Sequence, residues 1–405
     1  MLVTWAQSER GADRGFQLWD IASGALLAVL PCSYQSPCPI QFTPDGRQLV
    51  VFEGNILSTY TIGGADIHTS LAPSHSKVLA ATWLPDGSKA VSVSIERLPD
   101  GQALGVLTLS DPKNPGHPRR FSAAITPTDN REVAHSVAIS SDNRRAIVAF
   151  GGPNLALVNL ETGAFEAIPL SAQAIGSQAR FVPSDGSLWA FHASLERDAK
   201  ALVITTTVGP GPIAPWTEVW RDADSQMTSG LPGLSCMATA RNFVILGTNQ
   251  GRAQLFNADN LKLGPVNTLV MDRMPTRSVV MTSDASTIAA GNAEGSLFVF
   301  RPNNPKPDVV TGEHRGAIFA LSFNPEGTEL ASGGNDRGIR IWKVGPPGTK
   351  PTLKLTLPPA SAMIRGLSYS PDGKRLLVVV EGECAPRVWN LERLEAEFSR
   401  RGLSE

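Results

Sequence analysis

The chain has 405 residues, of which 42% are hydrophobic and 18% are charged, and its formal net charge at pH 7 is −1. This apolar fraction is typical of globular proteins and allows a sizeable core. The near-neutral charge gives no electrostatic reason to expect nucleic acid or an acidic membrane surface as a partner. No apolar run reaches the roughly 18 residues needed to cross a bilayer. Because the N-terminal residues also lack a signal-peptide pattern, we expect a cytoplasmic protein.

The four cysteines are Cys32, Cys38, Cys236 and Cys384, and they do not form a CxxC motif. Cys32 and Cys38 flank one predicted turn and could pair in an exported protein, but two reduced thiols are the favoured interpretation. The six histidines are dispersed, without the spacing of a zinc site. We therefore expect no metal and no cofactor.

Turns of the Pro-Asp-Gly type recur along the chain and predict hairpins, because proline presets φ and glycine supplies a positive φ. They lie at Pro44-Asp45-Gly46, Pro85-Asp86-Gly87, Ser184-Asp185-Gly186, Pro325-Glu326-Gly327 and Pro371-Asp372-Gly373. The turns at Ser141-Asp142-Asn143, Ala240-Arg241-Asn242 and Ser283-Asp284-Ala285 are weaker versions.

A short apolar run precedes each turn and predicts the innermost strand of one unit. These runs include Ile40–Phe42, Ala81–Trp83, Val137–Ile139, Ala179–Phe181, Val279–Met281, Leu321–Phe323 and Leu367–Tyr369. A second apolar run, an alternating third strand that often ends in an aromatic residue, and an outer fourth strand follow. The repeat period is roughly 40 to 50 residues, which predicts a single repeat array rather than several domains.

Such units cannot bury both faces alone and must stack around a shared axis. The predicted fold is therefore all-β, a β-propeller of four-stranded antiparallel blades, with eight blades as the best count and seven as the alternative. Residues 1–30 supply a partial N-terminal blade of three strands, and residues 31–391 form the propeller. Residues 392–405 form a short helical tail, in which Leu391, Leu394 and Phe398 fall on one face. Because the partial blade lacks an inner strand, we expect either a different ring closure or, slightly favoured, a fragment of a longer protein.

Four Gly- and Pro-rich segments interrupt the repeated pattern of strands and turns and are expected to be exposed connections. They are Leu98–Arg120, Val208–Gly233, Arg301–Gly312 and Gly345–Thr352.

One unit carries a complete set of polar residues at fixed strand positions. His314 precedes the inner strand, Ser332 lies on the second strand, Asp336 in the next turn and Trp342 at the end of the third strand. This unit resembles the WD-repeat family, whose members fold as β-propellers. The resemblance implies a structural relay in which Asp336 accepts from His314, His314 bridges to Ser332, and Ser332 accepts from the indole of Trp342. A hydrolase triad is disfavoured, since the spacing fits the relay and no GxSxG motif occurs.

The resemblance is divergent in the other units. The turn aspartate is replaced by Gln250, Glu294 or Glu383, and the tryptophan by Phe256 or Phe300. The array and its tail also resemble the propeller portion of bacterial multi-domain signalling proteins, in which it often follows a protein-kinase domain. No kinase motif is present in this sequence.

Five arginines lie beside the turns that project from one face of such a propeller. They are Arg14, Arg252, Arg315, Arg337 and Arg387. They predict a discontinuous basic rim for an acidic or phosphorylated peptide. Solvated surface charges are the simpler alternative.

The predicted function is that of a non-catalytic scaffold or regulatory module that binds other proteins or peptides, with no catalytic residues and neither nucleic acid nor membrane as a partner. The alternatives are a propeller enzyme that acts on a small molecule in its central channel, and a sensor fragment of a larger kinase-linked protein.

Overall fold

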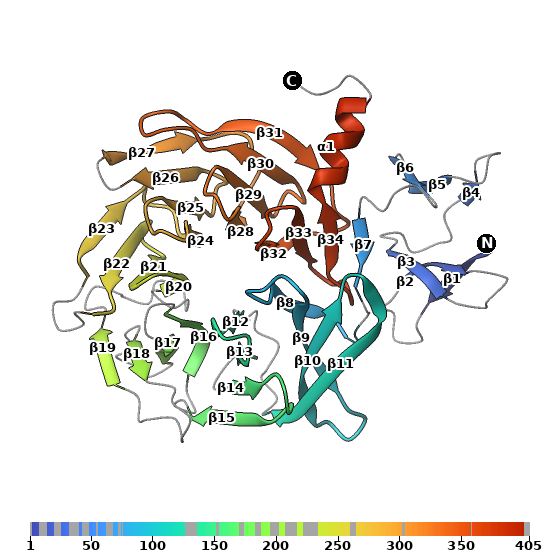
Figure 1. Ribbon diagram of the computed structural model, residues 1–405, viewed down its shortest axis with the longest axis horizontal. Coiled ribbons are helices and arrows are strands. Elements are labelled where there is room, and N and C mark those ends of the chain that lie inside the picture. Colours follow the sequence, from blue (N-terminus) through green and yellow to red (C-terminus); the bar gives the residue numbers. More distant parts are fainter. Residues whose placement is uncertain are drawn as a thin grey trace. The chain divides into compact units, whose positions relative to one another are not determined.

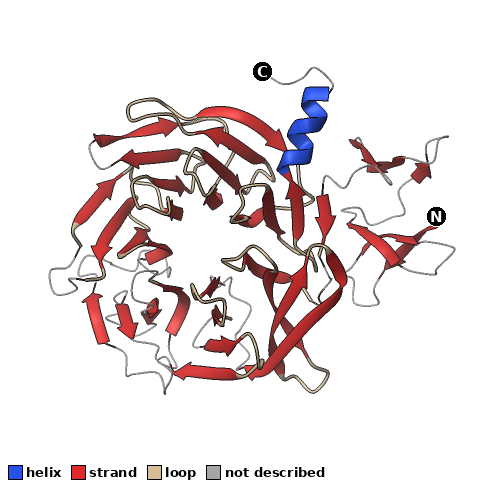
Figure 2. Ribbon diagram, in the orientation of Figure 1, coloured by secondary structure: helices blue, strands red, loops and turns tan. Residues whose placement is uncertain are grey.

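The chain divides into two compact units, Met1–Ser70 with Trp389–Glu405, and Leu71–Val388. The computed structural model describes residues 2–7, 14–19, 26–31, 40–42, 48–53, 56–61, 68–71, 74, 76–125, 136–150, 154–169, 174–182, 188–194, 202–206, 217–221, 234–259, 265–301, 304–357 and 359–400. Figure 2 shows that strands dominate, and α1 is the one helix within these residues.

The smaller unit contains two three-stranded antiparallel sheets. Strands β1 (Leu2–Gln7), β2 (Arg14–Trp19) and β3 (Leu26–Pro31) form one, and β4 (Ile40–Phe42), β5 (Gln48–Glu53) and β6 (Ile56–Thr61) form the other. The C-terminal helix α1 (Leu391–Arg400) belongs to the same unit and confirms the predicted helix.

Helix α1 begins where its sequence predicts. The side chain of Asn390 accepts a 3.0 Å hydrogen bond from the backbone nitrogen of Arg393, which is an N-cap. Leu391 and Leu394 are buried. The side chain of Phe398, which was predicted to share their face, lies outside the described residues.

The larger unit contains six antiparallel sheets, each made of four consecutive strands. The first three sheets contain β8 (Val78–Trp83), β9 (Ala90–Arg97), β10 (Ala103–Asp111) and β11 (Asn114–Ile125); β12 (Ser136–Ile139), β13 (Arg145–Ala149), β14 (Asn154–Asn159) and β15 (Phe165–Pro169); and β16 (Ala174–Phe181), β17 (Leu188–Ser194), β18 (Leu202–Thr206) and β19 (Thr217–Arg221). The next three contain β20 (Leu234–Ala240), β21 (Phe243–Thr248), β22 (Arg252–Asn257) and β23 (Asn267–Val270); β24 (Thr276–Met281), β25 (Ile288–Asn292), β26 (Leu297–Arg301) and β27 (Asn304–Val310); and β28 (Ile318–Phe323), β29 (Glu329–Gly334), β30 (Ile339–Lys343) and β31 (Thr352–Leu357).

The sheets of the larger unit surround a common axis, with the first strand of each sheet innermost (Figure 1). These first strands contact one another in the order β8, β12, β16, β20, β24, β28 and β32 (Ile364–Tyr369). Strand β32 contacts β8 in turn, which closes the ring. The larger unit is therefore a β-propeller.

Several side chains hold the closing seam between β8 and the last sheet. The indole nitrogen of Trp83 donates a 3.0 Å hydrogen bond to the carbonyl of Ser368. The Arg375 guanidinium carbon lies 4.5 Å from the centroid of the Trp83 ring, and Arg375 Nη2 donates to the carbonyl of Gly87 over 3.1 Å. The backbone nitrogen of Leu71 also donates to the carbonyl of Pro386 over 3.0 Å. Residues far apart in the sequence thus join the ends of the ring.

The predicted count of eight blades is wrong. Six blades consist of four consecutive strands, and the sheet after β31 has the order β32-β33-β34-β7. Strands β33 (Arg375–Val380) and β34 (Arg387–Asn390) continue β32, whereas β7 (His68–Ser70) directly follows β6 in the sequence. The unit predicted to begin at Ile40 is therefore left as the three-stranded sheet β4–β6. The repeated apolar runs predicted most of the strands, but they carry no information on which sheet a strand joins. The compact unit with the ring accordingly begins at Leu71, later than the residue 31 expected from the sequence.

Three predicted insertions contain strands instead. Residues 98–120 contain β10 and most of β11, residues 208–233 contain β19, and residues 301–312 contain β27. Val106 and Leu107 of β10 are buried, so their apolar side chains and not the flanking glycines and prolines decide the structure. The open outer edge of β11 tolerates Pro115 and Pro118, because edge strands need fewer backbone donors.

Within the described residues, the predicted hairpin turns between first and second strands form at Pro85-Asp86-Gly87, Pro325-Glu326-Gly327 and Pro371-Asp372-Gly373. The predicted turns at Pro44-Asp45-Gly46 and Ser184-Asp185-Gly186 lie outside the described residues. Gly327 and Gly373 have φ values of 72° and 70°, in the left-handed region that glycine enters without steric cost. Ser370 adds a side-chain contact, since its hydroxyl accepts a 2.9 Å hydrogen bond from the backbone nitrogen of Arg375. These turns fix the register of the two innermost strands.

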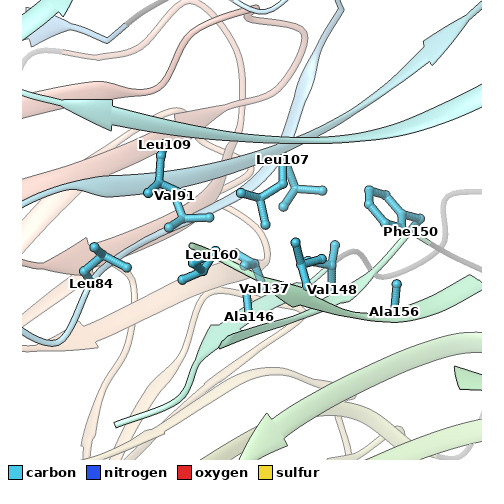
Figure 3. Close-up of a cluster of buried hydrophobic side chains, with 12 residues drawn as sticks. Leu84, Val91, Leu107, Leu109, Val137, Ala146, Val148, Phe150, Ala156 and Leu160 are labelled. Atoms are coloured by element: carbon cyan, nitrogen blue, oxygen red, sulfur yellow. The ribbon is translucent and has the colours of Figure 1, made fainter. Parts of the chain in front are cut away.

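The core lies between adjacent sheets. Second strands such as β25 and β29 are buried almost throughout, because neighbouring strands cover their edges and neighbouring sheets cover their faces. Figure 3 shows one such layer, in which Val91 and Leu107 meet Val137 and Val148 of the next sheet. Burial of these side chains is the main force that holds the ring together.

Candidate functional site

The four predicted relay residues meet in a continuous hydrogen-bonded network in the sheet β28–β31. His314 Nδ1 lies 3.0 Å from Oδ1 of Asp336, and His314 Nε2 lies 2.7 Å from Ser332 Oγ. The indole nitrogen of Trp342 donates to Ser332 Oγ over 2.8 Å. His314, Ser332 and Trp342 are buried. When His314 donates from Nδ1 to Asp336, its Nε2 accepts from the hydroxyl of Ser332, which in turn accepts from the indole of Trp342.

The network sets the protonation states of its two titratable members. Burial lowers the pKa of His314 below its ordinary value and outweighs the hydrogen bond and charge of Asp336. For Asp336, burial opposes ionisation, but the hydrogen bond and charge of His314 and the backbone nitrogens of Arg315 and Gly338 outweigh it and lower its pKa. The network thus holds a neutral imidazole beside a carboxylate at neutral pH.

A fifth member of the network, Arg340, was missed at the sequence level. Its Nη1 donates to Oδ2 of Asp336 over 2.9 Å. The last sheet repeats this pair, since Arg387 Nε donates to Oε2 of Glu383 over 2.8 Å. In both cases an acid in the turn between the second and third strands is followed four residues later by arginine. That spacing was present in the sequence and could have predicted both pairs.

The neighbouring blade replaces the relay with a different network. Asp272 and Ala290 occupy the positions that correspond to His314 and Ser332, and Phe300 corresponds to Trp342. Asn292 Nδ2 donates to Oδ2 of Asp272 over 2.7 Å, and Asn292 Oδ1 accepts from the backbone nitrogen of Ser296 over 2.8 Å. The relay residues are thus replaced together.

The five arginines of the predicted rim have different environments. Arg315 and Arg337 are exposed and flank Asp336 in the sheet β28–β31. Arg252 is exposed at the start of β22. Arg387 is bound to Glu383, so it is not available as a free cation. Arg14 begins β2 in the smaller unit, and its side chain lies outside the described residues. Arg315 and Arg337 therefore form the compact part of the rim.

The backbone beneath these two arginines is held in place by the network. The backbone nitrogen of Arg315 donates to Oδ2 of Asp336 over 3.2 Å. Arg337 has a φ of 63°, which costs a non-glycine residue energy, and its nitrogen donates to the carbonyl of Gly334 over 3.2 Å. The two guanidinium groups make no hydrogen bond or ion pair with the described residues, which leaves them able to bind an anion.

The remaining predictions on cysteines, metals and membranes have these outcomes. Cys236 is a buried free thiol, whereas Cys32 and Cys38 lie outside the described residues. Across the described part of the chain, no group of three or more His, Cys, Asp or Glu residues is arranged to hold a metal ion. No helix within that part has the length and apolar character to span a membrane.

Comparisons with known proteins match the WD-repeat resemblance. The family model for the WD domain, G-beta repeat, matches residues 306–343. The B-type cell cycle switch protein ccs52B of Medicago truncatula is 29% identical over 153 residues, which cover 37% of this chain and 30% of that protein. Eukaryotic translation initiation factor 3 subunit I of Phaeosphaeria nodorum is 35% identical over 98 residues, which cover 22% of this chain and 28% of that protein. The chain thus spans less than a third of the length of these relatives.

Among solved structures, the β-propeller domain of Cps50 (Swd1) from Myceliophteria thermophila superimposes with a TM-score of 0.59. The alignment covers 80% of this chain and 99% of that domain at 13% sequence identity, so the likeness concerns the fold. Together with the ring and the relay, these matches identify the class of protein as a propeller built from repeats. The larger unit folds as a β-propeller, and residues 306–343 match a WD repeat.

Proposed function

We propose that this chain is a non-catalytic interaction module that binds a protein or peptide at Arg315 and Arg337. The observation that carries the proposal is that one buried network supports two exposed arginines, Arg315 and Arg337, which make no ion pair with any residue that the structure describes. Asp336 accepts from the backbone of Arg315, and its turn holds Arg337. A rigid platform loses little conformational freedom when a partner binds, which favours affinity.

The same network argues against a hydrolase. A nucleophilic serine must present its hydroxyl to a substrate, but Ser332 is 0% exposed. Its oxygen is already engaged by His314 and by the indole of Trp342. The His, Ser and Asp side chains therefore stabilise the blade and present its surface loops.

The names of the relatives agree with a binding role. One is a cell cycle switch protein, and another is a subunit of a translation initiation factor, so it acts within an assembly. Guanidinium groups bind carboxylate and phosphate in a bidentate manner, so we propose an acidic or phosphorylated protein segment as the partner. The free thiol of Cys236 supports a reducing compartment, and we propose a cytoplasmic location and a regulatory or signalling role.

A pair of matched substitutions tests this function. Arg337→Gly, combined with Arg315→Ala, removes both guanidinium groups, and glycine preserves the left-handed backbone at residue 337. Arg241→Gly is the control, because Arg241 is also exposed, also has a positive φ, and lies in the turn between β20 and β21 at the opposite end of the strands. Each protein is used as bait in an affinity purification from its source cells, and bound proteins are quantified by mass spectrometry.

We expect a specific partner to be recovered with the unchanged protein and with the Arg241→Gly variant, but about tenfold less with the double variant. Equal recovery with all three baits would exclude this surface as the binding site.

A further inference from the structure

The first strands of the propeller share a local irregularity. Strands β8, β20, β24, β28 and β32 each contain a single-residue β-bulge at the same register position. The bulged residues are Leu79, Ser235, Arg277, Phe319 and Arg365. A bulge redirects a side chain out of the regular alternation of a strand and is common beside binding sites. All five side chains are half-buried.

Hydrogen bonds between neighbouring sheets fix the spacing of these bulges. The hydroxyl of Ser235 donates to the carbonyl of Thr276, the residue before Arg277. The hydroxyl of Ser278 donates over 2.8 Å to the carbonyl of Ile318, the residue before Phe319. Each hydroxyl comes from one first strand and holds the bulge of the next. The bulged residues of β24, β28 and β32 thus form a continuous arc at the innermost layer of the ring (Figure 1).

The arc combines an aromatic ring with two cations. The Arg365 guanidinium carbon lies 4.9 Å from the centroid of the Phe319 ring, and Arg365 Nη2 lies 3.0 Å from Oε1 of Glu381. This double contact orients Arg365. Arg277 makes no hydrogen bond or ion pair with the described residues.

The charges of the arc select the kind of anion. Arg277 and Arg365 carry two positive charges and Glu381 one negative charge, so these three side chains have a net charge of +1. Arg180 of β16, which acts on Cys236 together with Arg277, carries a further positive charge outside the arc. Cys236, next to Ser235, adds no charge, because burial raises the pKa of its thiol to about 12. A site with one net positive charge balances a carboxylate, whereas a phosphate group carries roughly −1.5 to −2.

We propose that Arg277, Phe319 and Arg365 form a subsite that binds one aspartate or glutamate side chain of a peptide. Arg277 holds the carboxylate, and Phe319 packs against the adjoining apolar part of the peptide. The inference rests on the proposed function and specifies where the recognised side chain enters and which anion it carries.

The test uses a phage-displayed library of random linear peptides, selected on the full chain. The unchanged protein is compared with Arg277→Glu and with the control Arg273→Glu, which makes the same charge change at an exposed arginine in the loop before β24. We expect the unchanged protein and the control to enrich peptides with Asp or Glu at one fixed position. Arg277→Glu should lose that preference and enrich Lys or Arg at the same position.

A selected peptide is then synthesised and titrated by fluorescence polarisation. Arg277→Gln should weaken its binding about tenfold or more, and exchange of its acidic residue for phosphoserine should not strengthen binding to the unchanged protein. Glu381→Gln raises the net charge of the arc to +2 and should shift preference toward the phosphoserine peptide. Thermal melting of each variant verifies that it folds.

The outcomes separate this inference from the proposed function. Enriched peptides without a fixed acidic residue, bound in a manner that depends on Arg315 and Arg337, would overturn the subsite and leave the proposed function standing. Equal affinity of Arg277→Gln and the unchanged protein for an acidic peptide would also overturn the subsite. Failure to enrich any peptide would overturn both, if the bait with Arg315→Ala and Arg337→Gly also recovers as much of each protein as the unchanged bait.

Discussion

Trp342 donates its indole hydrogen to the hydroxyl of Ser332 over 2.8 Å, and neither side chain is more than 1% exposed. A buried donor and a buried acceptor that bond only to members of one network stay satisfied only while every member is present. The neighbouring blade shows the alternative, with Phe300 and Ala290 in the corresponding places. Where one blade has the hydrogen-bonded pair of Ser332 and Trp342, the next has two apolar side chains, and its polar network forms between Asn292 and Asp272 instead.

Trp342→Phe should destabilise the protein by about 1 to 3 kcal/mol, because Ser332 loses its donor while the rest of the network stays buried. Ser332→Ala should cost at least as much, since it leaves the indole nitrogen of Trp342 and Nε2 of His314 without their hydrogen-bond partner. Denaturant unfolding measures both values. Midpoints equal to that of the unchanged protein would mean that the network contributes nothing to stability.

Stability should fall on mild acidification because of His314. Its pKa is lowered in the folded state, mainly by burial, so the unfolded chain binds a proton more readily near pH 6.5. The unfolded state then holds more protons, and the free energy of unfolding decreases as pH drops below about 6.5. The depressed pKa of Asp336 adds a further loss only as the pH falls through 3.8 and below.

Urea unfolding at pH 7.5 and pH 5.5 tests this sign. His314→Gln should be less stable at both pH values. It should lose less stability between them, because it lacks the protonation of His314 on unfolding, while the other five histidines contribute equally in both proteins. An identical loss in both proteins would assign the pH dependence to other groups.

Gly291→Ala should destabilise the seam between two blades by about 1 to 3 kcal/mol through overpacking. A Cβ atom at Gly291 would lie 2.7 Å from the Cβ of Ile318 and 2.8 Å from the hydroxyl of Ser278. Ile318 is 0% exposed and cannot move aside. Gly116→Ala, where the new atom meets nothing within 4 Å, is the control. Thermal melting that does not distinguish the two variants would contradict the close packing.

Cys236 should resist alkylation in the folded protein. Burial raises the pKa of its thiol to about 12, so almost no thiolate is present at neutral pH, and the side chain is only 6% exposed. We expect iodoacetamide to label Cys236 in guanidinium chloride but not in buffer, while the half-buried Cys384 reacts sooner. Peptide mapping by mass spectrometry gives the extent at each site. Rapid labelling of Cys236 in buffer would show that the buried contact between the sheets of β20 and β24 opens.

The local features were accessible from sequence because each depends on residues close together in the chain. Gly327 and Gly373 predicted their turns, since positive φ is a property of single residues. His314, Ser332, Asp336 and Trp342 were recognised from their places on successive strands. Arg387 was misjudged as a free cation, although Glu383 four residues earlier could have revealed its partner. The arc of Arg277, Phe319 and Arg365 left no signal, because its members come from three sheets and only the bulges bring them into line.

The sequence by itself determined the type of repeat, most of the strands, the turn chemistry and the members of the buried network. These follow from the alternation of side chains and from backbone preferences, which act over a few residues. Only the tertiary structure decided that six blades contain four consecutive strands, that the last sheet is completed by β7, and that Arg315 and Arg337 make no ion pair with the described residues. The physical reason is that ring closure depends on contacts between segments hundreds of residues apart, such as Trp83 and Ser368, and local preferences do not specify such contacts.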